Sequence, residues 1–368
     1  NEQKPFAEFW MGAHPSASSL LVNEEGERSL YTEIKKHPVK YIGEKVFNDF
    51  GELPYLFKIL DVKDMLSIQV HPSKTEAEKG YEAEDAAGVP LNAPNRNYRD
   101  KNHKPEVMVA LSEFWLLHGF LEKDGLLEVL RTVPEFGGFD DIFSLEGYKG
   151  LYRYVMEMPQ DEVNSLLMPL VEREVKAAAE GRLSKHQPGW WVNKLYRENI
   201  PVNIDRGVFS IYFFNIVKAL PGEAIFQGAG MPHAYLEGQN VELMANSDNV
   251  LRGGLTPKHV DVPELLKHTI FEGTVVNIMP GEKRGEGEAV YACPVPDFGL
   301  LKIALTTGQQ VTATAASLEI IVVMDGTLQV TGGNTVHARR GEAIAILAGE
   351  SYTITTSGAV LAYKAFVP

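Results

Sequence analysis

The sequence predicts a mainly β protein with a helical insert, in which two antiparallel β-barrel domains accompany an α-helical domain. Short apolar runs bounded by glycine, proline or asparagine fill residues 1–120 and return after the insert, a rhythm typical of antiparallel barrels and sandwiches. Residues 121–205 instead place apolar side chains at helical spacing. The chain has 368 residues, more than one ordinary core accommodates, so several packed units are expected.

The first β region contains one strongly marked helix. Ser73, with Glu76 three residues later, forms a capping box that predicts a helix running to about Ala87. Residues 88–104 are rich in proline and asparagine, which predicts a long ordered loop or a lid. The strands expected in this region cover residues 57–60, 66–70, 106–110 and 114–120.

The predicted insert contains three helices. The apolar residues Leu126 to Leu130 belong to a short first helix. The second helix spans residues 161–180, where Pro169 predicts a kink or a break, and the third covers residues 187–199.

Strand patterns return at Phe209, and one more short helix is expected at residues 262–268. The expected strands cover residues 209–219, 224–227, 234–236, 241–244, 318–323, 327–330, 343–347 and 352–355. The two β regions show a similar spacing of short apolar runs and turns, but no repeat of fixed length relates their sequences. The expected domains are a discontinuous β domain of residues 1–120 and 206–285, the helical insert of residues 121–205, and a second β domain of residues 286–368.

The charge balance argues against two classes of partner. The formal net charge is -14 and the isoelectric point is near 5.3, so nucleic acid and anionic membranes are poor partners. A small anionic substrate remains possible, because exposed charges are screened beyond roughly 8 Å and a local basic pocket can dominate. No apolar run approaches the length of a membrane span, and the polar start does not resemble a signal peptide.

Cys293 is the only cysteine. An intrachain disulfide is therefore excluded, which fits a cytoplasmic location. A zinc site built on several thiolates is excluded as well, so any metal must be bound by histidine, carboxylate or amide oxygen.

Two pairs of polar residues are spaced two apart on expected strands. Gln69 and His71 would point to one face of their strand, and Lys104 and Glu106 to one face of theirs. The amide oxygen, imidazole and carboxylate of these pairs suit zinc. The spacing therefore predicts two polar faces directed into one pocket.

A third polar cluster lies between residues 230 and 258. His233 follows a proline on an expected strand, and Glu242 lies among apolar neighbours. Asp248 and Arg252 belong to a polar turn followed by two glycines, which allow a backbone to approach a ligand closely.

Each cluster also has an ordinary explanation. Most histidines are solvated or hydrogen-bonded core residues, and a lysine beside a glutamate is often a surface ion pair. Residues 246–249 (NSDN) form a good turn without any ligand. From composition and spacing alone, a metal site and a set of separate structural roles both remain open.

At these residues the chain resembles the type I phosphomannose isomerases, zinc-dependent enzymes of the cupin superfamily. The segments that carry the resemblance are residues 7–15 (AEFWMGAHP), 66–72 (LSIQVHP), 97–106 (NYRDKNHKPE), 228–235 (GAGMPHAY) and 246–258 (NSDNVLRGGLTPK). The resemblance implies two cupin-like jelly-roll domains, of which the C-terminal one binds no metal, and a catalytic domain interrupted by the helical insert.

The resemblance also assigns roles to residues. It implies one zinc ion per chain, with four ligands: Gln69, His71, Glu106 and His233. It implies an essential arginine at Arg252, and it places Lys104 two residues before the ligand Glu106. Further implied contacts to substrate or phosphate are Ser67, Lys58 and Lys258.

Two departures from the family pattern are visible. Family members carry some 20 residues upstream of the first matching segment, and these are absent here. The C-terminal β region has no His-x-His pair, which agrees with a metal-free second cupin.

The implied reaction interconverts mannose 6-phosphate and fructose 6-phosphate. It opens the sugar ring and moves a proton between C2 and C1 through an enediolate. Asp248, Glu242 and Lys104 are the candidate proton-transfer groups, and Asp248 is preferred as the base. Lys104 is assigned to ring opening or charge stabilisation, and Arg252 to enediolate or phosphate binding.

Two other functions are weighed against this one. A cupin dioxygenase would hold iron with two histidines and a carboxylate, whereas Gln69 as a fourth ligand favours zinc. A non-catalytic sugar-binding bicupin would need no Lys104, Asp248 or Arg252 around a metal. The only partner expected is a sugar phosphate, and the chain is expected to be a monomer or a weak homo-oligomer.

Overall fold

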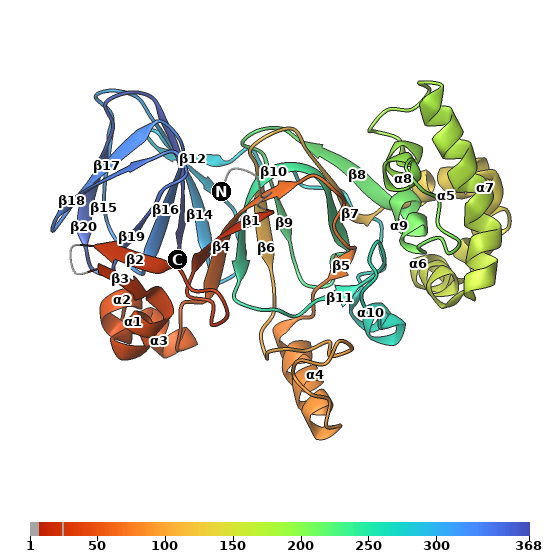
Figure 1. The fold of residues 1–368 in the computed structure, drawn as a ribbon, viewed down its shortest axis with the longest axis horizontal. Helices are drawn as coiled ribbons and strands as arrows, with labels where there is room; N and C mark the ends of the chain where they lie inside the picture. Colours follow the sequence, from red (N-terminus) through yellow and green to blue (C-terminus); the bar gives the residue numbers. More distant parts are fainter. Residues whose placement is uncertain (1–6, 24–25) are drawn as a thin grey trace.

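The computed structural model describes residues 7–23 and 26–368. A nine-stranded sheet lies in the middle of the molecule, with a helical lobe on one side of it and two C-terminal sheets on the other (Figure 1). The mainly β class with a helical insert is therefore confirmed.

The central sheet is organised around one long strand, β10 (His233–Ala245). The second half of β10 pairs with β4 and β6, and its first half pairs with β5 and β7. A small apolar core between the two halves of the sheet combines residues of β4 and β6 with residues of β7 and Tyr235. The other strands are β1 (Glu8–Gly12), β4 (Tyr55–Val62), β5 (Gln69–Val70), β6 (Glu106–Ala110), β7 (Phe114–Phe120), β8 (Phe214–Ala219), β9 (Ala224–Gln227) and β11 (Leu251–Arg252).

The sheets remain open. The central sheet ends on β1 and β11, so the predicted barrels do not close. The predicted strand at residues 66–70 is also shorter than expected, because only Gln69 and Val70 join the ladder. The strands predicted at 234–236 and 241–244 are one strand. A register shift between Tyr235 and Glu237 lets β10 carry a polar stretch that looks like a turn in the sequence.

The helical lobe packs on the outer face of β7 and of the first half of β10. The hydrophobic core of the lobe contains Trp115, Leu117 and Leu236 from these strands, packed against the apolar faces of the helices. The helices are α5 (Lys123–Thr132), the 3-10 helix η1 (Pro134–Phe136), α6 (Phe139–Glu157), α7 (Gln160–Ala179), α8 (Pro188–Tyr196) and α9 (Gly207–Phe213). α7 continues through Pro169, so the helix does not break there.

The first residues of the strand predicted at 209–219 are helical. They belong to α9, in which all seven residues are buried, and only Phe214–Ala219 forms a strand. The aromatic and β-branched residues of this segment favour strands by propensity, but tertiary packing of a short helix overrides that preference.

Five further helices and a hairpin lie outside the lobe. Ser73 caps α4 (Lys74–Ala86) by accepting a hydrogen bond from the Glu76 amide at 3.4 Å, which confirms the predicted cap. The helix predicted at 262–268 is confirmed as α10 (Val262–His268). The sequence analysis did not predict the hairpin β2 (Leu20–Asn23) and β3 (Gly26–Ser29) or the helices α1 (Leu30–Lys36), α2 (Pro38–Ile42) and α3 (Glu44–Phe50).

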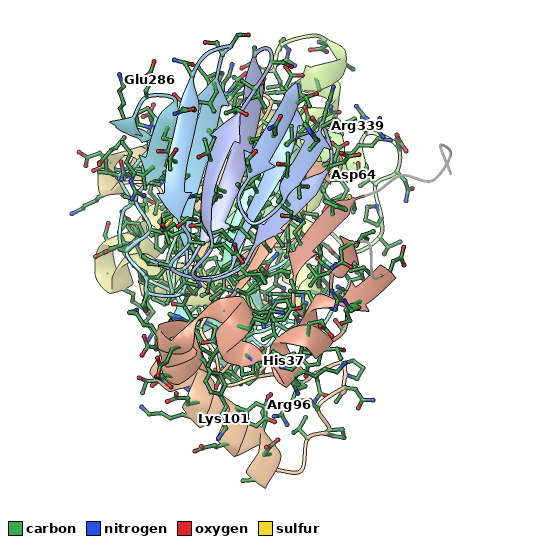
Figure 2. All side chains as sticks on the ribbon, turned by 90° about the vertical axis from the view of Figure 1, so that its left-hand side faces the viewer. His37, Asp64, Arg96, Lys101, Glu286 and Arg339 are labelled. Atoms are coloured by element: carbon green, nitrogen blue, oxygen red, sulfur yellow. The ribbon has the colours of Figure 1, made fainter. Side chains whose placement is uncertain are left out.

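The C-terminal region consists of a six-stranded and a four-stranded antiparallel sheet with a shared core. Figure 2 shows this end of the molecule, with Glu286 and Arg339 on its outer surface. Its strands are β12 (Glu282–Gly285), β13 (Glu288–Tyr291), β14 (Gly299–Leu305), β15 (Gln310–Thr314), β16 (Glu319–Asp325), β17 (Thr327–Thr331), β18 (Thr335–Arg339), β19 (Ala343–Ile346), β20 (Ser351–Thr355) and β21 (Val360–Phe366). A buried hydrogen bond from the Tyr55 hydroxyl to the Leu318 carbonyl, at 2.9 Å, connects it to the central sheet.

Within the part of the chain that the structure describes, no helix combines the length and the apolar composition needed to cross a bilayer.

Candidate active site

Three buried side chains converge at one end of the central sheet. They are His71, which follows β5, Glu106, the first residue of β6, and His233, the first residue of β10. One ligand atom from each lies within 4.8 Å of the other two. The Nε2 atoms of His71 and His233 are 3.4 and 3.3 Å from the two carboxylate oxygens of Glu106.

The hydrogen bonds of both histidines place a proton on Nδ1 and leave Nε2 directed at Glu106. The Nδ1 of His71 donates to the Asn249 carbonyl at 2.9 Å, and the Nδ1 of His233 donates to the Met231 carbonyl at 2.8 Å. Burial lowers the pKa of His71 to about 4, so its imidazole is neutral at pH 7 and its Nε2 carries only a lone pair. That Nε2 is buried and has no hydrogen-bond partner.

This arrangement fits a cation. Two imidazole Nε2 atoms face one carboxylate at 3.4 and 3.3 Å, and the buried lone pair of His71 has no hydrogen-bond donor, a need that a bound cation would satisfy. Imidazole and carboxylate ligands suit a borderline divalent metal such as zinc. Burial opposes ionisation of Glu106, but its interactions with His71 and with the Lys104 ammonium hold the pKa of this carboxyl well below its usual range.

The pairing of the strands places Gln69 beside these three side chains. It is directly opposite His233 on one side and Arg252 on the other. Residues that face each other in antiparallel strands point to the same side of the sheet. The amide of Gln69 is therefore directed to the same side as His233, which makes it a suitable fourth ligand.

A small cavity of about 100 Å³ connects these residues with other predicted side chains. Lys104 reaches it with its ammonium 3.5 Å from a Glu106 oxygen, although it precedes β6 rather than belonging to it. The residues that line the cavity are Glu8, Lys58, Leu60, Leu66, Gln69, Lys104, Glu106, His233, Ala234, Tyr235 and Glu242.

A buried Lys-Glu-Tyr cluster forms the far wall of the cavity. Glu242 accepts a hydrogen bond from the Tyr235 hydroxyl at 2.9 Å and lies 3.1 Å from the Lys58 ammonium. Burial raises the pKa of Glu242, and the negative charge of Glu106 adds to the effect. Burial opposes the charge of Lys58, but the Glu242 carboxylate keeps the pKa of Lys58 above its usual value.

Comparison with known proteins gives a consistent result. Residues 1–123 match the family model described as phosphomannose isomerase type I, catalytic domain. The chain is 38% identical to mannose-6-phosphate isomerase of Escherichia coli over 96% of this chain and 90% of that protein. It is 40% identical to the Salmonella typhimurium enzyme over 81% and 75% of the two chains, and 34% identical to the human enzyme over 96% and 86%. The chain belongs to the type I phosphomannose isomerase family.

Solved structures of the family agree with this assignment. A variant of phosphomannose isomerase from Salmonella typhimurium superimposes with a TM-score of 0.89 at 34% identity, over 100% of this chain and 92% of that one. A mannose 6-phosphate isomerase bound with zinc and yttrium gives a TM-score of 0.82 at 34% identity, with the same coverage.

The other site residues implied by the family resemblance lie outside the cavity. Arg252 is half-buried on β11 opposite Gln69, and Ser67 precedes β5 by two residues. Lys258 is exposed. Asp248 is also exposed, with its carboxylate 3.4 Å from the Nε2 of His14.

Sequence reasoning missed two residues that shape this family site. Asn249 is fully buried, and its carbonyl orients His71. Tyr235 lines the cavity, and its position two residues after His233 on one strand was a usable signal. No local pattern pointed to the contact between His14 and Asp248, because it depends on two loops that are distant in the chain.

Proposed function

We propose that the protein interconverts mannose 6-phosphate and fructose 6-phosphate with one zinc ion per chain. The observation that carries the proposal is the convergence of the Nε2 atoms of two imidazoles on the Glu106 carboxylate. His71, Glu106 and His233 would hold the ion, together with the amide oxygen of Gln69. The mannose-6-phosphate isomerase relatives and the zinc-containing structure support this choice of substrate and metal.

The reaction needs acid-base groups near an enediolate. A bound zinc ion supplies Lewis-acid polarisation of substrate oxygens without redox chemistry. We infer that Asp248 transfers the proton between C2 and C1, and that Lys104 assists ring opening or stabilises charge. Glu242 is the alternative base, and its burial raises its pKa.

The substrate phosphate would bind outside the cavity. Arg252 is the main candidate for a bidentate contact to it or to the enediolate, and Ser67, two residues before β5, is a further candidate contact. Lys258 and Lys58 are further candidate contacts. The buried ion pair of Lys58 with Glu242 favours a role for Lys58 within the cavity rather than at the phosphate.

The finer expectations about organisation belong to the same proposal. We infer cupin-like jelly rolls from the facing antiparallel sheets, with a catalytic domain of residues 1–120 and 206–285. The helical insert would then be residues 121–205, and the metal-free domain residues 286–368. We further propose a cytoplasmic monomer or weak homo-oligomer that binds a sugar phosphate and neither nucleic acid nor membrane.

A coupled assay tests the function. Fructose 6-phosphate formation from mannose 6-phosphate is measured before and after treatment with a chelator, and again after zinc is restored. We expect activity to be lost with the metal and recovered with zinc. Stoichiometric iron with oxygen uptake would instead indicate a dioxygenase. Binding of zinc and hexose phosphate without interconversion would indicate a sugar-binding protein.

A further inference from the structure

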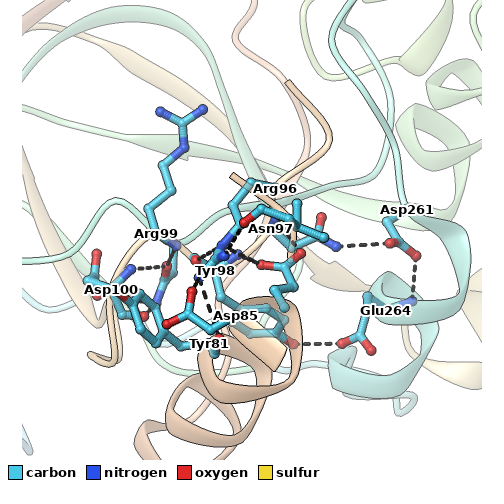
Figure 3. Close-up of polar contacts among 12 residues, drawn as sticks. Tyr81, Asp85, Arg96, Asn97, Tyr98, Arg99, Asp100, Asp261 and Glu264 are labelled. Carbon is cyan, nitrogen blue, oxygen red and sulfur yellow. Dashed lines mark hydrogen bonds and ion pairs between the residues drawn. The ribbon is translucent and has the colours of Figure 1, made fainter. Parts of the chain in front are cut away.

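The loop of residues 88–104 is fixed to the fold by most of its polar side chains (Figure 3). Arg96 is buried and donates to the carbonyls of Tyr98 and Val89 at 2.7 and 2.6 Å, and it pairs with Asp85 at 2.8 Å. The Tyr98 hydroxyl donates to Glu264 of α10 at 2.6 Å. The loop is therefore an anchored part of the fold in this structure.

Arg99 is the exception within this anchored segment. Its backbone amide donates to the Asn249 side-chain oxygen at 2.7 Å, which fixes the position of the residue. Its side chain extends away from the network, and none of the contacts drawn in Figure 3 reaches its guanidinium. Among the described residues, no hydrogen bond or ion pair involves that guanidinium.

Arg252 presents a second cation next to this one. It lies three residues after Asn249, so Asn249 fixes the backbone of Arg99 while belonging to the turn that leads into Arg252. Within residues 7–23 and 26–368, its guanidinium also has no ion-pair partner. Burial lowers the pKa of Arg252 and the charge of Arg99 lowers it further, as expected for two neighbouring like charges.

The neighbouring carboxylates already have other partners. The charge of Arg99 contributes to the lowered pKa of Asp248, but the main cause is the hydrogen bond of Asp248 with His14. Asp100, next to Arg99 in the chain, accepts hydrogen bonds from the Ser247 hydroxyl and the Asp248 amide. Two guanidiniums without ion-pair partners, one of them on the strand that pairs with Gln69, suit a phosphate dianion.

We propose that Arg99 is a phosphate-binding residue, and that it clamps the phosphate monoester of the substrate together with Arg252. The inference rests on the proposed function for the identity of the substrate and extends it to a loop residue for which no role was assigned. Arg99 would contribute uniform binding energy, because the phosphate is unchanged in the transition state.

The test compares three variants of the full-length, zinc-loaded protein. Arg99→Gln removes the charge but keeps most of the length, and Arg99→Lys keeps the charge. Lys101→Gln is the matched control, because it removes a cation two residues away that already pairs with Glu82 on the surface. The measurements are KM and kcat for mannose 6-phosphate, and the affinity for inorganic phosphate by competitive inhibition and by calorimetry.

We expect Arg99→Gln to raise KM and weaken phosphate binding about ten- to a hundredfold, with kcat within about threefold of the parent. Arg99→Lys should recover most of the loss, and Lys101→Gln should behave like the parent protein. Unchanged KM and phosphate affinity in Arg99→Gln would overturn the clamp, as would equal shifts in Arg99→Gln and Lys101→Gln. If the parent protein binds phosphate through Arg99 but does not convert mannose 6-phosphate, the proposed function fails and the clamp stands.

Discussion

The Nδ1 of His71 donates to the backbone carbonyl of Asn249 at 2.9 Å, so a residue 178 positions away in the chain orients a candidate metal ligand. The side chain of Asn249 also forms hydrogen bonds with the loop before β6. It donates to the carbonyls of Asp100 and Asn102 at 2.8 and 2.9 Å, and it accepts from the amide of Arg99. One buried amide thus holds both the ligand-orienting turn and the loop before β6.

Asn249→Ala should weaken zinc binding about ten- to a hundredfold, because it frees the turn whose carbonyl fixes the ring of His71. It also leaves buried backbone groups unpaired, at a cost of about 1–3 kcal/mol each. Zinc affinity is measured by competition with a chromogenic chelator, and stability by urea unfolding. Asn246→Ala in the same turn is the control, since its side chain makes only a long contact with Glu52 at 3.4 Å. Equal zinc affinities in the two variants would contradict the orienting role.

The metal-free protein should lose stability as the pH falls from about 6.5 toward 4. Burial lowers the pKa of His71 to about 4 and that of His118 to about 3, whereas both titrate near 6.5 when unfolded. Between these values the unfolded chain binds more protons than the folded one, so acidification favours unfolding. His71 contributes at most about 3 kcal/mol and His118 at most about 5 kcal/mol, and the loss is complete once the pH is below both folded pKa values.

Urea unfolding of the chelator-treated protein at pH 7, 6, 5 and 4 measures this dependence. His118→Gln should reduce the pH dependence of the unfolding free energy by the equivalent of about one bound proton between pH 6.5 and 4. Of the two buried histidines, only His71 then remains. His337→Gln, at an exposed position, is the matched control. A stability that is flat from pH 7 to pH 4 would show that neither imidazole is held in its neutral form.

The buried pair of Lys58 and Glu242 should show strong coupling. Lys58→Met leaves the Glu242 carboxylate buried without its cation and should destabilise the protein by about 3–5 kcal/mol. Glu242→Gln added to Lys58→Met should recover much of that loss, because no unpaired charge remains. Urea unfolding of the two single variants and the double variant gives the coupling energy. The exposed pair of Lys45 and Asp49 serves as the control and should give less than about 0.5 kcal/mol.

The sequence predicted the site better than it predicted the strands around it. Alternation within strands suggested that Gln69 and His71, and Lys104 and Glu106, share a pocket. The pocket does contain Gln69, Lys104 and Glu106, yet His71 and Lys104 lie outside the strands themselves. The residue types were informative because few side chains can bind a metal, whereas strand ends depend on pairing partners far away in the chain.

Other features could not be predicted for the same reason. The helix α9 has a strand-like composition, and its burial against the helical lobe decides its conformation. The shared strand β10 contains polar residues that look like a turn, and only its two sets of pairing partners make it continuous. The approach of Arg99 to Arg252 depends on a side-chain hydrogen bond to Asn249 and has no local sequence signal.

Asp248→Asn should reduce turnover about a hundredfold or more if Asp248 transfers the proton in isomerisation. The hydrogen bond with His14 lowers the pKa of Asp248, so the residue is a carboxylate at neutral pH and is ready to accept a proton. Activity should then fall only when the pH drops below that lowered pKa. His14→Ala removes the main cause of the lowering, so the acid limb of the profile of kcat/KM against pH should move to higher pH.

The measurement is kcat and kcat/KM for mannose 6-phosphate from pH 3 to 8, with Asp49→Asn as an exposed control. Near-normal turnover in Asp248→Asn would remove Asp248 from the mechanism. The base would then be sought at Glu242, which lines the cavity and whose pKa is raised by burial, or at Lys104. An unchanged acid limb in His14→Ala, together with a large loss in Asp248→Asn, would keep Asp248 as an essential residue but assign that limb to another group.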